Sequence, residues 1–66
     1  MDFSKYINKW VKVDLTNGHF YEGIVLTDTT NTTLELKDRN GQMVTLSFQV
    51  VLYIREVKRG NGNGRY

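Results

Sequence analysis

The side chains that could perform chemistry are few and scattered along this 66-residue chain. The chain has no Cys, which removes disulfides, thiolate metal ligands and cysteine nucleophiles together, and His19 is its single histidine. Acids such as Asp14 and Glu22 alternate with apolar residues, as solvated surface charges do. Asp28 and Asn31 with the neighbouring threonines could bind a cation, although an Asx-type turn explains the same residues. We therefore expect no enzyme: no catalytic residue, no cofactor, no metal and no small-molecule substrate, with His19 on the surface.

The net positive charge of the chain comes from its C-terminal segment. Nine Lys and Arg against seven Asp and Glu give a formal charge of +2. Lys58, Arg59 and Arg65 lie in the Gly/Asn-rich segment 58–66, which has no acid, so the other six bases face seven acids and residues 1–57 carry −1. We expect one domain over 1–57 and a flexible tail over 58–66, which either only solubilises the protein or contacts nucleic-acid phosphates. No signal peptide or membrane span is recognisable, so a cytoplasmic protein without membrane contact is expected.

The first ten residues have the spacing of a short amphipathic helix, with Asp2 placed to cap it. Its apolar stripe consists of Phe3, Tyr6, Ile7 and Trp10. Such a helix would close the open end of a small barrel. The alternative is a helix for a membrane surface or a partner, for which the segment is short and poor in basic residues.

From Trp10 onward the apolar period changes to two, which predicts strands joined by tight turns. Asn17-Gly18 and Asn40-Gly41 predict hairpins, because both residues of each pair tolerate positive φ. Gly23 falls inside a strand, where a missing side chain permits a sharp bend or a close backbone approach. The expected strands cover about 11–16, 19–27, 34–37, 44–48 and 50–54.

The last expected strand is apolar on both faces, so both faces should be covered. It consists of Val50, Val51, Leu52, Tyr53 and Ile54, which we predict to form a subunit interface. Open sheet edges invite association, and a ring in which the fourth strand of one subunit pairs with the fifth strand of the next would cover them. The alternative is burial of this strand under the N-terminal helix.

The segment from Val11 to Val25 resembles the first Sm motif. It has Leu15, Asn17, Gly18, Tyr21 and Gly23 at the spacing of that motif, and the order of helix, strands and turns over about residues 3–57 is similar to that of Sm-like proteins. The resemblance implies a mainly β fold in which a short N-terminal helix precedes a strongly bent, five-stranded antiparallel SH3-like barrel. Members of this family, which include Sm and Lsm proteins and bacterial Hfq, form rings of six or seven subunits that bind single-stranded RNA.

The resemblance also implies where RNA would bind, in the loop 28–33 and in the segment 46–49. In the family the first loop carries an Asp, a stacking ring and an Asn. Here Asp28 matches, Thr33 takes the Asn position, the loop is one residue longer, and Asn31 is the nearest amide. In the second motif Ser47 stands in place of an Arg and Phe48 in place of a Gly. Phe48 could supply the missing stacking surface, although its alternation with Val44 and Leu46 favours a place in the core.

The candidate sites follow from this resemblance and from the basic composition of the segment 58–66. The RNA-binding candidates are Asp28, Thr30, Asn31, Thr33, Ser47, Phe48 and Gln49, and the phosphate-contact candidates are Lys58, Arg59 and Arg65. The expected function is a homo-oligomeric ring that binds single-stranded U- or A-rich RNA in RNA metabolism or riboregulation. The alternatives are a structural or protein-interaction ring that has lost base recognition, and a monomeric SH3-like module that binds peptides.

Overall fold

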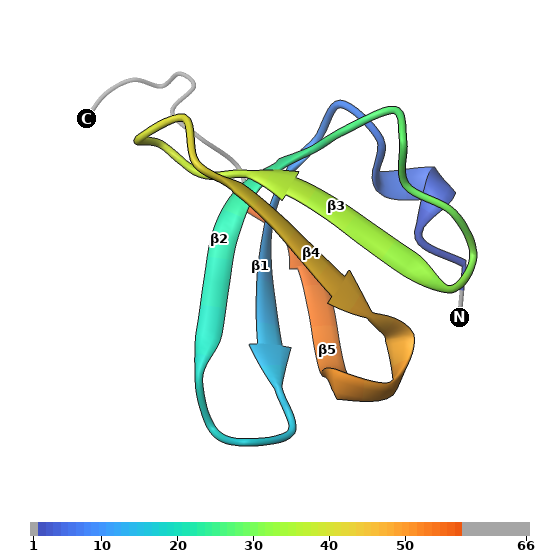
Figure 1. The fold of residues 1–66 in the computed structure, drawn as a ribbon, viewed down its shortest axis with the longest axis vertical. Coiled ribbons are helices and arrows are strands. Elements are labelled where there is room, and N and C mark those ends of the chain that lie inside the picture. The colour runs from blue at the N-terminus through green and yellow to red at the C-terminus, as the bar shows by residue number, and fades with distance from the viewer. Residues whose placement is uncertain (1, 58–66) are drawn as a thin grey trace.

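The computed structural model describes residues 2–57, which form a small antiparallel β structure (Figure 1). Two single 3₁₀ turns, η1 and η2, accompany its five strands. The elements are η1 (Ser4–Tyr6), β1 (Trp10–Leu15), β2 (Phe20–Val25), β3 (Thr33–Lys37), β4 (Met43–Ser47), η2 (Phe48–Val50) and β5 (Val51–Glu56). None of the helical segments within 2–57 is long or apolar enough to cross a bilayer.

The strands form one sheet in the order β4-β3-β2-β1-β5. Every neighbouring pair is antiparallel, so the predicted mainly β, five-stranded antiparallel sheet is confirmed. The sheet folds over until β3 and β4 lie across β1 and β5 (Figure 1), but β4 and β5 remain its two edges and do not pair. The closed barrel of the prediction is therefore not formed by the single chain.

Gly23 is the point at which the sheet bends. A Cβ at this position would lie 2.5 Å from the carbonyl oxygen of Lys37 and 3.2 Å from the Cα of Asp38. Strand β2 pairs with β1 from Phe20 to Ile24, and only Ile24 and Val25 pair with β3. The predicted close backbone approach at Gly23 is confirmed, because the exit of β3 passes directly over it.

Both predicted hairpins form, but their turns differ from the expected ones in which both the Asn and the Gly have positive φ. In the first, the Leu15 N–H donates to the His19 carbonyl at 2.8 Å, and Gly18 has φ +88°. In the second, the Asp38 N–H donates to the Gln42 carbonyl at 3.0 Å, and Gly41 has φ +82°. Only the glycine of each Asn-Gly pair takes a positive φ, which is the pattern of a three-residue loop that ends on a left-handed residue.

The predicted N-terminal helix is wrong in length, because only the turn η1 forms. The chain leaves helical geometry at Asn8, whose φ is 69°, and Ile7 forms a parallel bridge with Val25 of β2. Trp10 already belongs to β1. Asp2 lies two residues before the first residue of the turn, and its Oδ1 accepts hydrogen bonds from the Ser4 hydroxyl at 2.6 Å and the Ser4 backbone N–H at 3.0 Å. These two hydrogen bonds lower the pKa of the Asp2 carboxyl.

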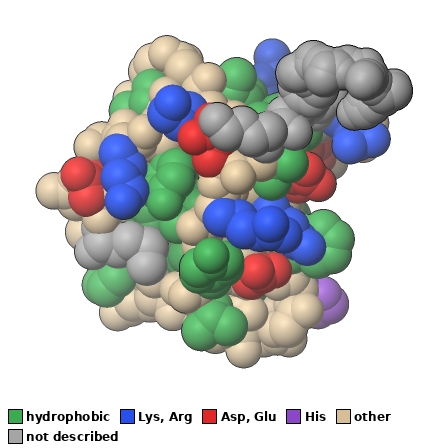
Figure 2. Space-filling view, turned by 180° about the vertical axis from the view of Figure 1, so that it is seen from behind, with side chains coloured by type: hydrophobic (Ala, Val, Ile, Leu, Met, Phe, Trp, Pro, Cys, Tyr) green, Lys and Arg blue, Asp and Glu red, His purple; other side chains and the backbone are tan. Residues whose placement is uncertain are grey.

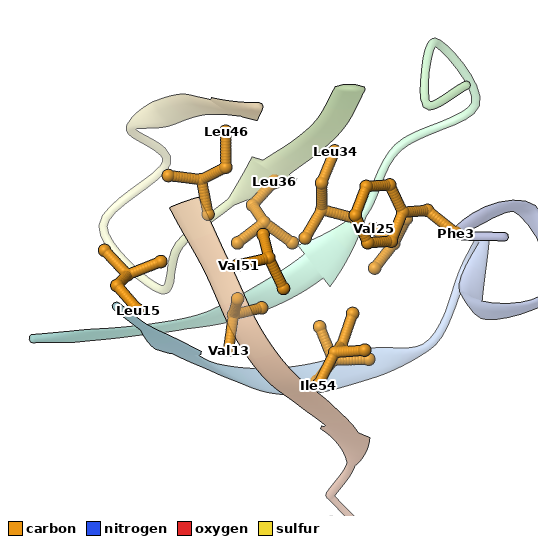
Figure 3. Packing of buried hydrophobic residues seen from close by; sticks show 10 residues of the cluster. Phe3, Val13, Leu15, Val25, Leu34, Leu36, Leu46, Val51 and Ile54 are labelled. Atoms are coloured by element: carbon orange, nitrogen blue, oxygen red, sulfur yellow. The ribbon is translucent and has the colours of Figure 1, made fainter. Parts of the chain in front are cut away.

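The core lies between the two halves of the folded sheet. Phe3, which is completely buried, reaches into it from the N-terminal segment beside Val25 and Leu34 (Figure 3). The N-terminal segment thus fills the open end of the sheet with one aromatic side chain. The core consists of Phe3, Val11, Val13, Leu15, Val25, Leu34, Leu36, Leu46, Val51 and Ile54.

Candidate nucleic-acid interface

The two segments predicted to bind RNA lie side by side in the structure. Thr33, the first residue of β3, pairs with Ser47, the last residue of β4. Beyond that pair the Phe48 N–H donates a 2.8 Å hydrogen bond to the Thr32 carbonyl. The hairpin register of β3 and β4 therefore brings the loop 28–33 against η2, although the two segments are far apart in the sequence. We call their combined surface the loop site.

A threonine organises the loop from within. The Thr30 hydroxyl accepts hydrogen bonds from the N–H groups of Thr32, at 3.3 Å, and Thr33, at 3.1 Å. The Thr30 N–H in turn donates to the Thr33 carbonyl at 2.8 Å. The Asx-type turn that was the alternative to a cation site does not form in this loop, since Thr30 rather than Asp28 or Asn31 supplies the side-chain oxygen. Thr30 is thus a positioning residue of the loop.

Thr29 holds the loop to the sheet, and the sequence interpretation missed it. It is the only buried polar side chain of the described chain, with an exposed fraction of 7%. Its hydroxyl oxygen accepts a hydrogen bond from the Glu35 N–H at 2.9 Å and donates one to the Glu35 carbonyl at 3.3 Å. A threonine hydroxyl here replaces a missing strand partner of Glu35. No pattern in a run of Thr and Asn distinguishes this residue from its neighbours.

Phe48 lies at the surface, so the favoured prediction of a core position is wrong. Its exposed fraction is 44%. The alternation of β4 stops at Ser47, whose hydroxyl accepts the Gln49 N–H at 3.2 Å and caps the 3₁₀ turn η2. That turn changes the direction of the following side chains and leaves the Phe48 ring partly in solvent, next to Thr32.

Three polar side chains of the loop site have no hydrogen bond to any residue within 2–57. They are Asp28, Asn31 and Gln49, and all three are exposed. Together they offer a carboxylate acceptor and two amides, each of which has a donor and an acceptor. With the exposed ring of Phe48 in η2, the two segments carry the kinds of group that stack on a planar base and hydrogen-bond its edge.

The predicted subunit interface divides into two kinds of residue. Val51 and Ile54 are buried in the chain's own core, so they are not available to a neighbour. Val50, Leu52 and Tyr53 are exposed, and Leu52 shows 65% of its surface. The pairing of β1 with β5 steps from Asp14–Tyr53 to Leu15–Val51, which makes Leu52 an extra, bulged residue. The alternative cover, an N-terminal helix over β5, is ruled out because no such helix forms.

On the face of the described part that Figure 2 shows, the charged side chains do not form a region of one sign. Figure 2 shows basic, acidic and hydrophobic side chains next to one another on the face seen from behind. Within residues 2–57 the closest oppositely charged pair is Lys9 with Glu56, at 4.0 Å. The predicted phosphate contacts Lys58, Arg59 and Arg65 lie outside the described residues.

The remaining chemical candidates stay apart. His19 is exposed in the first hairpin, where its backbone N–H donates to the Asn17 side-chain oxygen at 3.0 Å. In the described chain no group of three His, Asp or Glu side chains could hold a metal ion.

Comparison with protein-family models, with curated proteins and with solved structures finds no match. The resemblance to the Sm-like family therefore stays a prediction.

Proposed function

We propose that this protein is an Sm-like, cytoplasmic subunit that assembles into a homo-oligomeric ring and binds single-stranded RNA at the loop site. The observation that carries the proposal is the junction of the two loops, where the Phe48 N–H meets the Thr32 carbonyl at 2.8 Å. This junction brings the segment that carries Phe48 and Gln49 against the loop that carries Asp28 and Asn31. Single-stranded RNA is recognised through such stacking and base-edge contacts.

The two free sheet edges support assembly. In strands β4 and β5 one side of the backbone has no strand partner within residues 2–57. Exposed apolar side chains accompany these edges, among them Met43 on β4 and Leu52 on β5. A free edge with apolar side chains is a template for another strand, and pairing β4 of one copy with β5 of the next leaves no edge in a closed ring.

In the proposed complex each chemical group has one task. Phe48 stacks on a base, which contributes roughly 1–3 kcal/mol per base in other single-strand binding proteins. Asp28, Asn31 and Gln49 hydrogen-bond the base edge, and Thr30 keeps the loop in shape. Lys58, Arg59 and Arg65 contact phosphates, which makes the affinity fall as salt rises.

The second candidate function is a protein-interaction ring of the same subunits without RNA. It is favoured by the charge of residues 1–57, where six bases face seven acids. A near-neutral body gives little of the electrostatic attraction on which RNA binding depends. The two functions share the assembly and differ in the loop site.

Titration of fluorescent oligo-U and oligo-A with the purified full chain, at low and high salt, separates the two functions. The RNA-binding ring predicts micromolar or tighter binding of one oligomer, weakened by salt and by Phe48→Leu. The control variant is Lys37→Gln, which removes one exposed positive charge from β3, away from the loop site, and so measures the effect on binding of losing a charge outside that site. No binding of either oligomer by a protein that light scattering shows to be assembled refutes the RNA function and leaves the interaction ring.

A further inference from the structure

The outer face of β2, β1 and β5, opposite the core, carries two rows of side chains across the strands. One row consists of Phe20, Asp14 and Tyr53, because Asp14 pairs with Phe20 on one side and with Tyr53 on the other. The next row consists of Glu22, Lys12 and Arg55, by the same register. We call these six residues the outer face. Basic, acidic and hydrophobic side chains lie side by side on the rear of the molecule (Figure 2).

The groups of the outer face are incompletely satisfied within the chain. Asp14 makes no hydrogen bond or ion pair with any residue of 2–57 although it is half-buried, and Arg55 likewise has no acid within reach there. The Lys12 Nζ lies 4.5 Å from the centre of the Phe20 ring rather than on a carboxylate. Phe20 and Tyr53 show 57% and 56% of their surfaces to solvent. The outer face thus combines unpaired charges of both signs with two large exposed rings.

We propose that the outer face docks on the outer face of a second copy of this chain. Lys12 and Asp14 are two residues apart on β1, with Val13 between them. A two-fold axis that lies between the two sheets, runs across the strands and passes over Val13 therefore brings Lys12 of one copy opposite Asp14 of the other. Asp14 of each copy then faces Lys12 of the other, and Tyr53 of each faces Arg55 of the other. The pattern is self-complementary in charge and also allows a cation–π contact on β5. The Glu22 carboxylate, which would face the Phe20 ring of the other copy, already accepts a 3.0 Å hydrogen bond from the Trp10 indole of its own chain.

The docking uses the outer face of the sheet rather than the free edges of the proposed ring, and Tyr53 is the one residue of the predicted subunit interface that belongs to it. Strand β1 lies between β2 and β5 inside the sheet, and it offers no free edge. Face-to-face packing of two sheets leaves β4 and the edge of β5 open to ring neighbours. The outer face spans three strands and is small, so the contact between two chains is weak and depends on concentration. Docking doubles whatever unit the edges form.

Charge-reversal variants in sedimentation velocity test the docking. The wild-type chain should show a concentration-dependent doubling of mass that salt weakens. Lys12→Asp leaves only acids on the face of β1 and Asp14→Lys leaves only bases, so either variant alone should lose the doubling, with affinity reduced about tenfold or more. An equimolar mixture of the two variants should restore it, as should the double reversal Lys12→Asp/Asp14→Lys in one chain.

The restoration arms make the test independent of folding defects, because a misfolded variant would not regain association when mixed with its opposite. Circular dichroism of each variant confirms the β fold. The proposal is overturned if wild type shows no doubling, if the single reversals double as wild type does, or if neither the mixture nor the double reversal regains it. Leu52→Asp, which lies outside the outer face, should lose the ring unit and still show the doubling, so a failure of edge assembly and a failure of the docking are distinguishable.

Discussion

Replacing Thr29 by valine removes one hydroxyl and keeps the volume of the side chain. In the structure this hydroxyl is the hydrogen-bond acceptor of the Glu35 N–H, at 2.9 Å. The Glu35 carbonyl keeps a second donor, the Leu26 N–H at 2.8 Å, so only the N–H loses its partner. An N–H left without a partner away from water costs about 1–3 kcal/mol, and we expect Thr29→Val to lower the free energy of unfolding by that amount.

The measurement is thermal or urea unfolding, followed by circular dichroism. For a domain of this size each 1 kcal/mol corresponds to a change in Tm of about 4–8 °C, so the loss is easily measured. Thr29→Ser is the matched control, because it retains the hydroxyl and removes only a methyl group, at a cost of about 1 kcal/mol or less. A Thr29→Val protein as stable as wild type, or a Thr29→Ser protein as unstable as Thr29→Val, would contradict the role of this hydroxyl.

Three further predictions concern the bend, the loop site and the N-terminus. Gly23→Ala should destabilise the fold by about 1–3 kcal/mol in urea unfolding, because its Cβ would meet backbone atoms of Lys37 that cannot move aside; an unchanged midpoint would contradict the close approach. Phe48→Leu should leave stability within about 0.5 kcal/mol of wild type and weaken oligonucleotide binding roughly tenfold or more; equal binding would remove Phe48 from the proposed site. Ser4→Ala should raise the pKa of the Asp2 carboxyl toward its ordinary value in an NMR titration, since the Ser4 hydrogen bonds hold it down. Because the pKa of this carboxyl is lower in the folded than in the unfolded state, it stabilises the fold at pH values above its unfolded-state pKa, and this stabilisation is lost as the pH falls through the folded-state pKa. An ordinary pKa of Asp2 in the wild-type protein would refute the hydrogen bonds to Ser4.

Local turn chemistry and alternation were enough to predict the sheet. Gly18 and Gly41 end their hairpin loops, and Gly23 marks the bend, because each position requires a residue without a side chain. The same reasoning misjudged the N-terminus. Phe3 and Ile7 are spaced as on a helix, yet Ile7 forms a bridge with β2, a long-range contact that no local pattern reveals.

The hairpin pattern of the sequence predicts that the two candidate segments meet, but not how their side chains lie. The register of β3 and β4 follows from the hairpin at Gly41, and it is enough to bring the two loops together. Phe48 was assigned to the core because alternation continues through it, whereas a cap by Ser47 starts a turn there. Thr29 could not be identified, since its role depends on a hydrogen bond to a strand six residues away.

The mass of the full chain in solution tests the central proposal most directly. Size-exclusion chromatography with light scattering, at a concentration low enough to separate docked units, should give six or seven times the 7.7 kDa mass of the chain. Leu52→Asp, which places a charge on the β5 edge, should reduce that mass. A monomer that persists at the highest attainable concentration would contradict edge-to-edge assembly and favour a single SH3-like module.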